Sequence, residues 1–164
     1  MKKLIISSLF LYFATTTLLI AKDKDVKRED GIENVSSNVL QQFGYNFYKA
    51  SNISWTVNKT YQKATFLLNG KTTYAIYDLE NKFLVSTQLI EVSELPEKVQ
   101  ESLSKEYKEY KILNVLKVVS RPSDYQFQDD TNAYWIDLSS KDQHLFAVSL
   151  SGISLTVVKT EKTI

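Results

Sequence analysis

The sequence predicts an α+β fold of two tandem units, each a helix followed by four strands, with the helices on one face of an antiparallel sheet and the other face open. Three observations predict it. The apolar period changes from 3.6 residues to 2 within each half of the chain. Asn69-Gly70, the strongest short hairpin signal, joins two alternating segments. Finally, two helices are too few to cover both faces of eight antiparallel strands.

The first 21 residues have the pattern of an export signal. Lys2 and Lys3 precede an apolar run, residues 4–20, and Ala21 is followed at once by a polar stretch. A basic start, a short apolar run and a small residue at the break are what signal peptidase requires. An uncleaved anchor is the alternative, and membrane contact is then expected only through this segment. We therefore expect a periplasmic or secreted protein.

Composition excludes several functional classes. The chain has 164 residues, 43% hydrophobic and 24% charged, with a net charge of +1, so it is neither disordered nor strongly attracted to nucleic acid. It has no cysteine, which excludes disulfides, thiolate metal ligands and cysteine nucleophiles. Residues 22–30 alternate in charge without an apolar period, and residues 22–35 are expected to form a flexible tether. A docking tail is the alternative.

The first unit, residues 36–92, is expected to begin with a helix capped by Ser36 or Ser37 and running to about Lys49. Four strands should follow, at about 53–57, 64–68, 72–76 and 83–90. The residues expected to face the helix on the second and third strands are Ala64, Phe66, Leu68 and Ile76.

The second unit, residues 93–160, repeats this order. Leu95-Pro96 opens a helix, because proline is tolerated in the first turn. Glu101 and Lys105 are spaced to pair on its solvent side. The apolar stripe of the helix is Val99, Leu103 and Tyr107, and the strands are expected at about 112–119, 134–139, 144–150 and 153–159.

An internal duplication accounts for this repetition. Val39 and Phe43 correspond to Val99 and Leu103 at an offset of 60 residues, and later pairs such as Tyr74 and Phe146 correspond at an offset of 72. One insertion in the second unit, residues 121–132, explains the difference. The alternative is chance similarity between two β-rich stretches.

The pattern resembles the exported PepSY-like family of bacteria, whose fold is similar to that of β-lactamase-inhibitor proteins. The resemblance covers roughly residues 36 to 159. It implies a periplasmic or secreted, non-enzymatic tandem α+β module that binds or inhibits another protein. The residues that carry it are Ile53-Ser-Trp55, Ala64 to Tyr77, Asp78 to Leu84, Glu94-Leu-Pro96 with Val99 and Tyr107, and Tyr110-Lys-Ile112.

Residues for catalysis or for a metal are scarce. His144 is the only histidine, it starts a strand without a nucleophile motif nearby, and it is expected to be a partly exposed edge residue. Asp129-Asp130 reads as a solvated acidic turn. Strand alternation places Asp137 opposite its apolar neighbours, so we expect it to be exposed. The sequence thus predicts no catalytic residue, no metal and no cofactor, and a protein that is not an enzyme.

Aromatic side chains out of phase with the core predict a protein-binding surface. Exposed tyrosine and tryptophan with apolar neighbours are typical of binding hot spots, although scattered apolar surface is an equally ordinary explanation. The expected partner is another exported or envelope protein. The alternative function is a carrier of a small apolar or peptide-like ligand held between sheet and helices. The candidate binding residues are Leu67, Tyr77, Trp135 and Asp137 on the open face and Tyr125 and Phe127 in the insertion.

Overall fold

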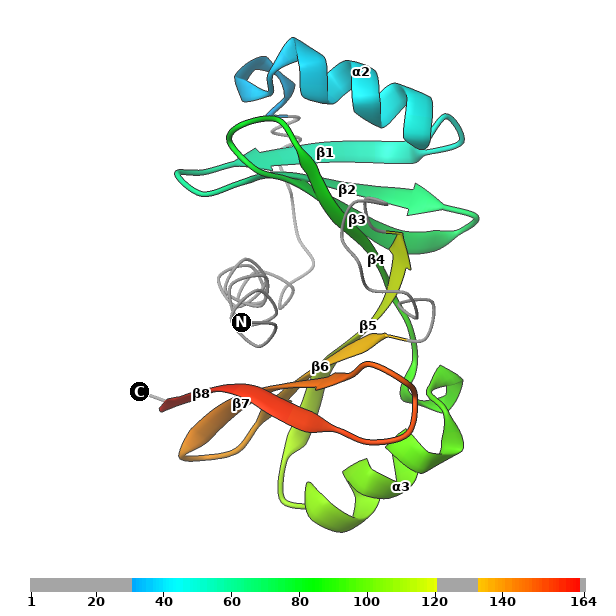
Figure 1. The fold of residues 1–164 in the computed structure, drawn as a ribbon, viewed down its shortest axis with the longest axis vertical. Helices are drawn as coiled ribbons and strands as arrows, with labels where there is room; N and C mark the ends of the chain where they lie inside the picture. The colour runs from blue at the N-terminus through cyan, green and yellow to red at the C-terminus, as the bar shows by residue number, and fades with distance from the viewer. Residues whose placement is uncertain (1–30, 121–132, 163–164) are drawn as a thin grey trace. The chain divides into compact units, whose positions relative to one another are not determined.

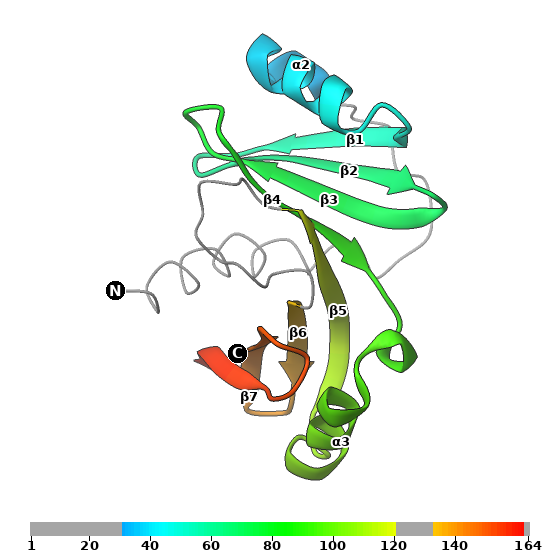
Figure 2. The same cartoon turned by 45° about the vertical axis from the view of Figure 1, so that its right-hand side comes forward.

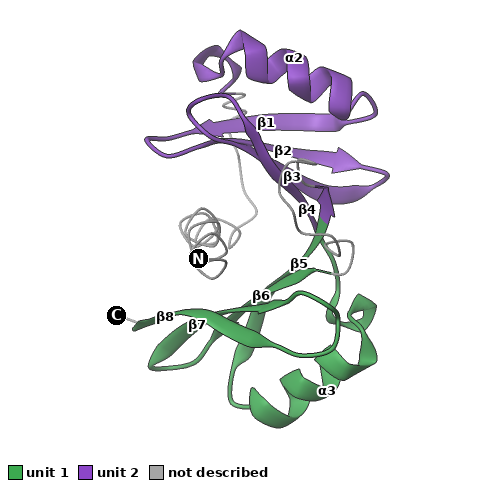
Figure 3. Ribbon diagram, in the orientation of Figure 1, with its two compact units in different colours: residues 1–14, 89–118, 126–164 green, residues 15–88, 119–125 purple. Residues whose placement is uncertain are grey.

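The computed structural model describes residues 31–120 and 133–162 (Figure 1). The chain divides into two compact units (Figure 3). The N-terminal unit comprises residues 31–88 with 119–120, and the C-terminal unit comprises residues 89–118 with 133–162. Tyr125 and Phe127, predicted to bind a partner, lie outside the described residues.

One helix and four strands follow each other twice, and the strands form an antiparallel sheet in chain order from β1 to β8. The elements before the middle of the chain are η2 (Ile32–Asn34), α2 (Ser37–Asn46), β1 (Ser51–Val57), β2 (Gln62–Leu68), β3 (Lys71–Tyr77) and β4 (Phe83–Leu89). Those after it are η3 (Val92–Glu94), α3 (Glu97–Glu106), β5 (Lys111–Ser120), β6 (Tyr134–Ser139), β7 (Gln143–Ser149) and β8 (Thr156–Lys162).

Helix α2 begins where the sequence predicts. The Ser36 side chain accepts a hydrogen bond from the backbone N–H of Val39 at 3.2 Å, the geometry of an N-cap. The predicted end at Lys49 is wrong, because Phe47 already leaves the helical region with φ −127°. Gly44 and Asn46 explain the earlier end, since both are weak helix formers.

Helix α2 lies beside its part of the sheet (Figures 1 and 2). An aromatic core joins the two. The Phe43 ring lies 5.0 Å from the Phe66 ring and 5.1 Å from the Trp55 ring, both edge to face. Such pairs add about 0.5–1.5 kcal/mol each beyond the burial of their area. These contacts hold α2 on one face of β1 to β4.

The predicted orientation of β3 is wrong. The turn residues Asn69 and Gly70 have φ values of 53° and 77°, as the hairpin signal predicts. This two-residue turn pairs Leu68 with Lys71, so even-numbered residues of β2 pair with odd-numbered residues of β3. Tyr77 therefore lies in the core under α2, and Ile76, predicted to be there, lies on the opposite face.

Helix α3 packs on β5 to β7 as its sequence pattern predicts. Val99 and Leu103 are buried, and Ile136 and Leu138 of β6 face them in one core. On the solvent side, the Lys105 ammonium lies 3.4 Å from the Glu101 carboxylate, as their spacing predicts.

Strand β8 begins three residues later than predicted, at Thr156 rather than Ile153. Gly152 has φ 69°, and its backbone N–H donates a hydrogen bond to Ser149 Oγ at 3.1 Å. This turn packs against Pro96. The residues after Gly152 therefore form a loop, and pairing with β7 begins only at Thr156.

A second glycine fixes η2 against the edge of the sheet. Gly31 has φ 55°, and a Cβ atom built on it would lie well inside van der Waals contact with the Trp55 carbonyl oxygen. Only glycine permits both this backbone conformation and this close approach. The short 3-10 turn is thereby held next to β1.

We predict that Gly31→Ala lowers the free energy of unfolding more than Gly70→Ala does. Both glycines have positive φ, but an added Cβ meets no atom within 4 Å at Gly70. The Gly70 variant should lose about 1 kcal/mol from backbone strain alone, and the Gly31 variant at least about 2 kcal/mol. Urea denaturation measures both, and equal losses would contradict the close packing of Gly31 on β1.

Candidate functional site

Two predicted binding residues lie on the reverse face of the C-terminal unit, the face of β5 to β8 opposite α3. Trp135 and Asp137 alternate with the core residues of β6, as predicted. Their predicted exposure is wrong, because Trp135 is 2% and Asp137 6% exposed. Trp135 is paired across the sheet with Leu116 and Val148, and both of these residues are buried as well.

Asp137 is the centre of a polar network on this face. Asn114 of β5 donates a hydrogen bond from Nδ2 to its Oδ2 at 3.3 Å, and His144 of β7 contacts its Oδ1 through Nε2. Both carboxylate oxygens are therefore engaged, which compensates for the burial of the charge. His144 is partly exposed, as predicted, but it lies on a central strand rather than at an edge.

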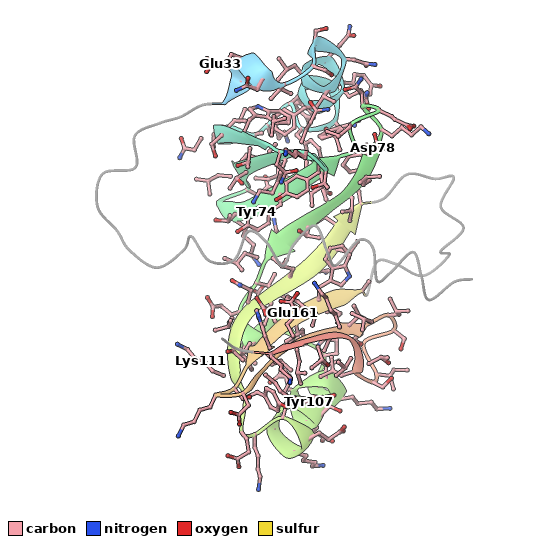
Figure 4. The ribbon with its side chains drawn as sticks, turned by 90° about the vertical axis from the view of Figure 1, so that its left-hand side faces the viewer. Glu33, Tyr74, Asp78, Tyr107, Lys111 and Glu161 are labelled. Carbon is pink, nitrogen blue, oxygen red and sulfur yellow. The ribbon has the colours of Figure 1, made fainter. Side chains whose placement is uncertain are left out.

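The Phe146 ring lies between the Asp137–His144 contact and an ion pair on β8. The Phe146 ring lies 4.5 Å from the His144 ring, and the Lys159 ammonium lies 5.5 Å from the centre of the Phe146 ring. Lys159 also contacts the Glu161 carboxylate at 2.5 Å. Figure 4 shows Glu161 on β8. We call Asp137, His144, Phe146, Lys159 and Glu161 the β6–β8 cluster.

The β6–β8 cluster presents charges of both signs around a buried ring. The side chains of His144, Lys159 and Glu161 are 22%, 23% and 42% exposed, whereas that of Asp137 is 9% exposed. A partner can therefore reach the outer three groups, while Asp137 orients one of them. Within the described residues, no group of three or more histidine or acidic side chains is placed to hold a metal ion.

The reverse face of the N-terminal unit is also partly apolar. Leu67 lies on it, as predicted, and is partly exposed. On the same strand the Lys63 ammonium lies 5.5 Å from the centre of the Tyr74 ring, a cation–π contact. Burial lowers the pKa of Lys63 to about 8 and raises the pKa of Tyr74 above its usual value. Within the described residues, the strand that carries Leu67 thus has one cation–π contact on this face.

Tyr77 is not part of any surface. It is fully buried among Trp55 and Phe83, with ring centres 6.2 Å and 5.4 Å away. Its hydroxyl has no hydrogen-bond partner in the part of the chain that the structure describes. Burial raises the pKa of Tyr77 well above its usual value.

Sequence reasoning missed the contribution of β8 to the site. Pairing of Asp137 with Phe146 and of Phe146 with Lys159 places the three in one cross-strand row. The turn from Ser140 to Gln143 sets the first pairing. A serine at the start of a turn is a signal that the sequence carries, and Ser140 Oγ accepts a hydrogen bond from the Gln143 backbone N–H. The second pairing depends on the shifted start of β8, for which the sequence contains no comparable signal.

Comparison with solved structures identifies the fold. A DUF2874 family protein from Bacteroides uniformis superposes with a TM-score of 0.61 at 16% identity, covering 78% of this chain and 89% of that one. A BLIP-like protein from Bacteroides fragilis has a TM-score of 0.59 at 12% identity, covering 77% and 85%. A protein from Bacteroides eggerthii, proposed to be periplasmic, has a TM-score of 0.60 at 17% identity, covering 78% and 88%.

These likenesses show a BLIP-like α+β fold, which confirms the predicted similarity to β-lactamase-inhibitor proteins at the level of fold. The sequence matches no protein-family model and no curated protein. Across the described residues, no helix is both long and apolar enough to cross a membrane.

We predict that Tyr77→Phe raises the free energy of unfolding by about 1 kcal/mol at neutral pH, because it removes a buried hydroxyl without a partner. The difference should widen above pH 10: tyrosine in the unfolded chain ionises there, whereas Tyr77 in the folded chain does not. Tyr45→Phe, at a residue 86% exposed, is the control and should change nothing. If both variants change the free energy of unfolding equally in urea titrations, the buried, unpartnered position of the Tyr77 hydroxyl is contradicted.

We predict that Asp137→Ala lowers the free energy of unfolding by about 1–3 kcal/mol, because Asn114 and His144 lose a buried acceptor. Glu101→Ala removes a carboxylate from the exposed pair on α3 and should cost less than about 0.5 kcal/mol. Thermal and urea denaturation of both variants measure the difference. Indistinguishable stabilities would show that the Asp137 network carries no net stabilisation.

Proposed function

We propose that this chain is an exported, non-catalytic protein-binding module, inhibitor-like or accessory to the envelope, that uses the reverse face of β6 to β8. The observation that carries the proposal is the β6–β8 cluster, in which the partly exposed His144 and Lys159 lie beside the Phe146 ring and Lys159 pairs with Glu161. Partly exposed polar and charged groups of this kind are typical of the rim of a protein interface.

The proposal assigns different roles to the residues of this face. His144, Lys159 and Glu161 make the contacts, because their side chains reach the surface. Trp135 and Asp137 lie beneath and hold the rim in place, which replaces the direct contact expected from the sequence. Charges of opposite sign favour a partner with the complementary pattern and oppose others.

Export is supported by the basic and apolar start of the chain, residues 1–21. A fold neighbour proposed to be periplasmic is consistent with it. We also propose that the two units arose by duplication within a PepSY-like family. The order of one helix and four strands in each unit supports this, together with the 60-residue and 72-residue offsets.

We predict that Lys159→Ala weakens binding of the partner at least about tenfold, which corresponds to about 1.4 kcal/mol. The wild-type protein is used to capture proteins from a cell-envelope extract, and the Kd of the captured protein is then measured for each variant. Lys105→Ala is a matched control, because it removes a lysine from an ion pair with glutamate on the opposite face of the same unit.

Retention of the partner by the Lys105 variant and its loss by the Lys159 variant would support the cluster as the binding surface. Equal affinity of both variants would move the interface elsewhere. A specifically captured protein is displaced by an excess of free wild-type chain. If no captured protein behaves in this way, the proposed binding role is contradicted.

A further inference from the structure

An apolar pocket lies in the N-terminal unit and shares no residue with the proposed binding surface. It has a volume of about 410 Å³ and opens between α2, η2 and the edge strand β1. Binding pockets for small molecules usually measure about 300–1,000 Å³, so its size is sufficient for one. The lining residues are Ile32, Leu40, Phe43, Ile53 and Trp55.

The pocket lies where α2 and η2 meet the edge strand β1. Phe43 and Trp55 close its floor and are 5% exposed, and they belong to the aromatic core. Strand β1 has no outer neighbour in the sheet, and the short turn η2 lies beside it and contributes Ile32 to the pocket. Ile32 and Ile53 remain 50% and 39% exposed at the rim, which leaves two large aliphatic side chains in contact with water.

The lining determines the chemistry of the ligand. None of the five side chains is ionisable, and the Trp55 indole is the only one with a hydrogen-bonding group. Water in such a site finds few partners, and a charged ligand finds no counter-charge. We propose that this pocket binds the uncharged hydrocarbon chain of a small amphiphile, with its polar head at the rim beside Ile32 and Ile53.

Its size argues against a protein occupant. A specific protein interface buries about 800 Å² on each partner and involves about 20–30 residues a side, whereas five of the described residues line this pocket. A hydrocarbon chain requires no such area. The location, between helix and sheet, is also where the sequence predicts an apolar ligand as the alternative function.

The pocket is held open before a ligand arrives. The close packing of Gly31 on the Trp55 carbonyl fixes η2 and with it Ile32, which forms one wall. The Ser36 cap and the Phe43 ring contacts fix α2, which forms the opposite wall. A rigid apolar site needs little reorganisation on binding, and this favours even a short chain.

The test uses hexanol, octanol and decanol as probes and follows the methyl NMR signals of the whole chain. We expect saturable shifts at the methyl groups of Ile32, Leu40 and Ile53 and none at Ile153, an exposed isoleucine of the C-terminal unit. Each added methylene contributes about 0.8 kcal/mol when buried, so Kd should fall about fourfold per methylene until the pocket is filled.

Ile53→Trp fills the pocket with a larger side chain and should weaken decanol binding at least about tenfold. Ile153→Trp adds the same bulk at an exposed loop position and should leave it unchanged. Equal weakening by both variants, absence of saturable shifts at the three methyl groups, or a Kd independent of chain length would overturn the proposal. If Ile53→Trp does not fold, the wild-type shifts and the chain-length series decide. Because the pocket lies outside the β6–β8 cluster, neither result depends on whether a protein partner binds there.

Discussion

The register between paired strands decides which side chains of this protein meet a helix and which meet the reverse face. Side chains alternate along a strand, so a shift of one residue would exchange the two faces completely. The two-residue turn at Asn69 and Gly70 sets this register for β2 and β3. The aromatic core under α2 depends on it, because Phe66 and Tyr77 reach the same core only in that pairing.

Much of the fold could be predicted from local signals. The Ser36 cap, the Asn69-Gly70 turn and the Glu101–Lys105 pair each depend on neighbours in the chain, and all three are present. Apolar alternation alone predicts the wrong orientation for β3. A two-residue turn pairs even-numbered residues of β2 with odd-numbered residues of β3, and the alternation does not include this constraint. Tyr77 and Ile76 are both apolar enough for a core, so composition could not distinguish them.

The candidate site was less predictable, for a physical reason. Asp137 and His144 are recognisable as polar residues in β strands, yet their contact arises from a hairpin pairing, and the approach of Lys159 and Glu161 from a second one. Each pairing adds an uncertainty of register, and the loop around Gly152 displaces β8 by an amount that no periodicity encodes. Strand alternation predicts the face on which Trp135 lies but not that this part of the face is buried.

The packing of Gly31 on Trp55 has a consequence for solubility. A strand at the end of a sheet offers unpaired amide and carbonyl groups to strands of other molecules, which is a common route to aggregation. In β1 the carbonyl of Trp55 is covered by η2, so a foreign strand cannot run the full length of this edge. At the other end of the sheet, β8 carries Lys159, Glu161 and Lys162, whose charges discourage the same pairing. Each of the two edge strands, β1 and β8, thus has a feature that opposes backbone pairing with a strand of another molecule.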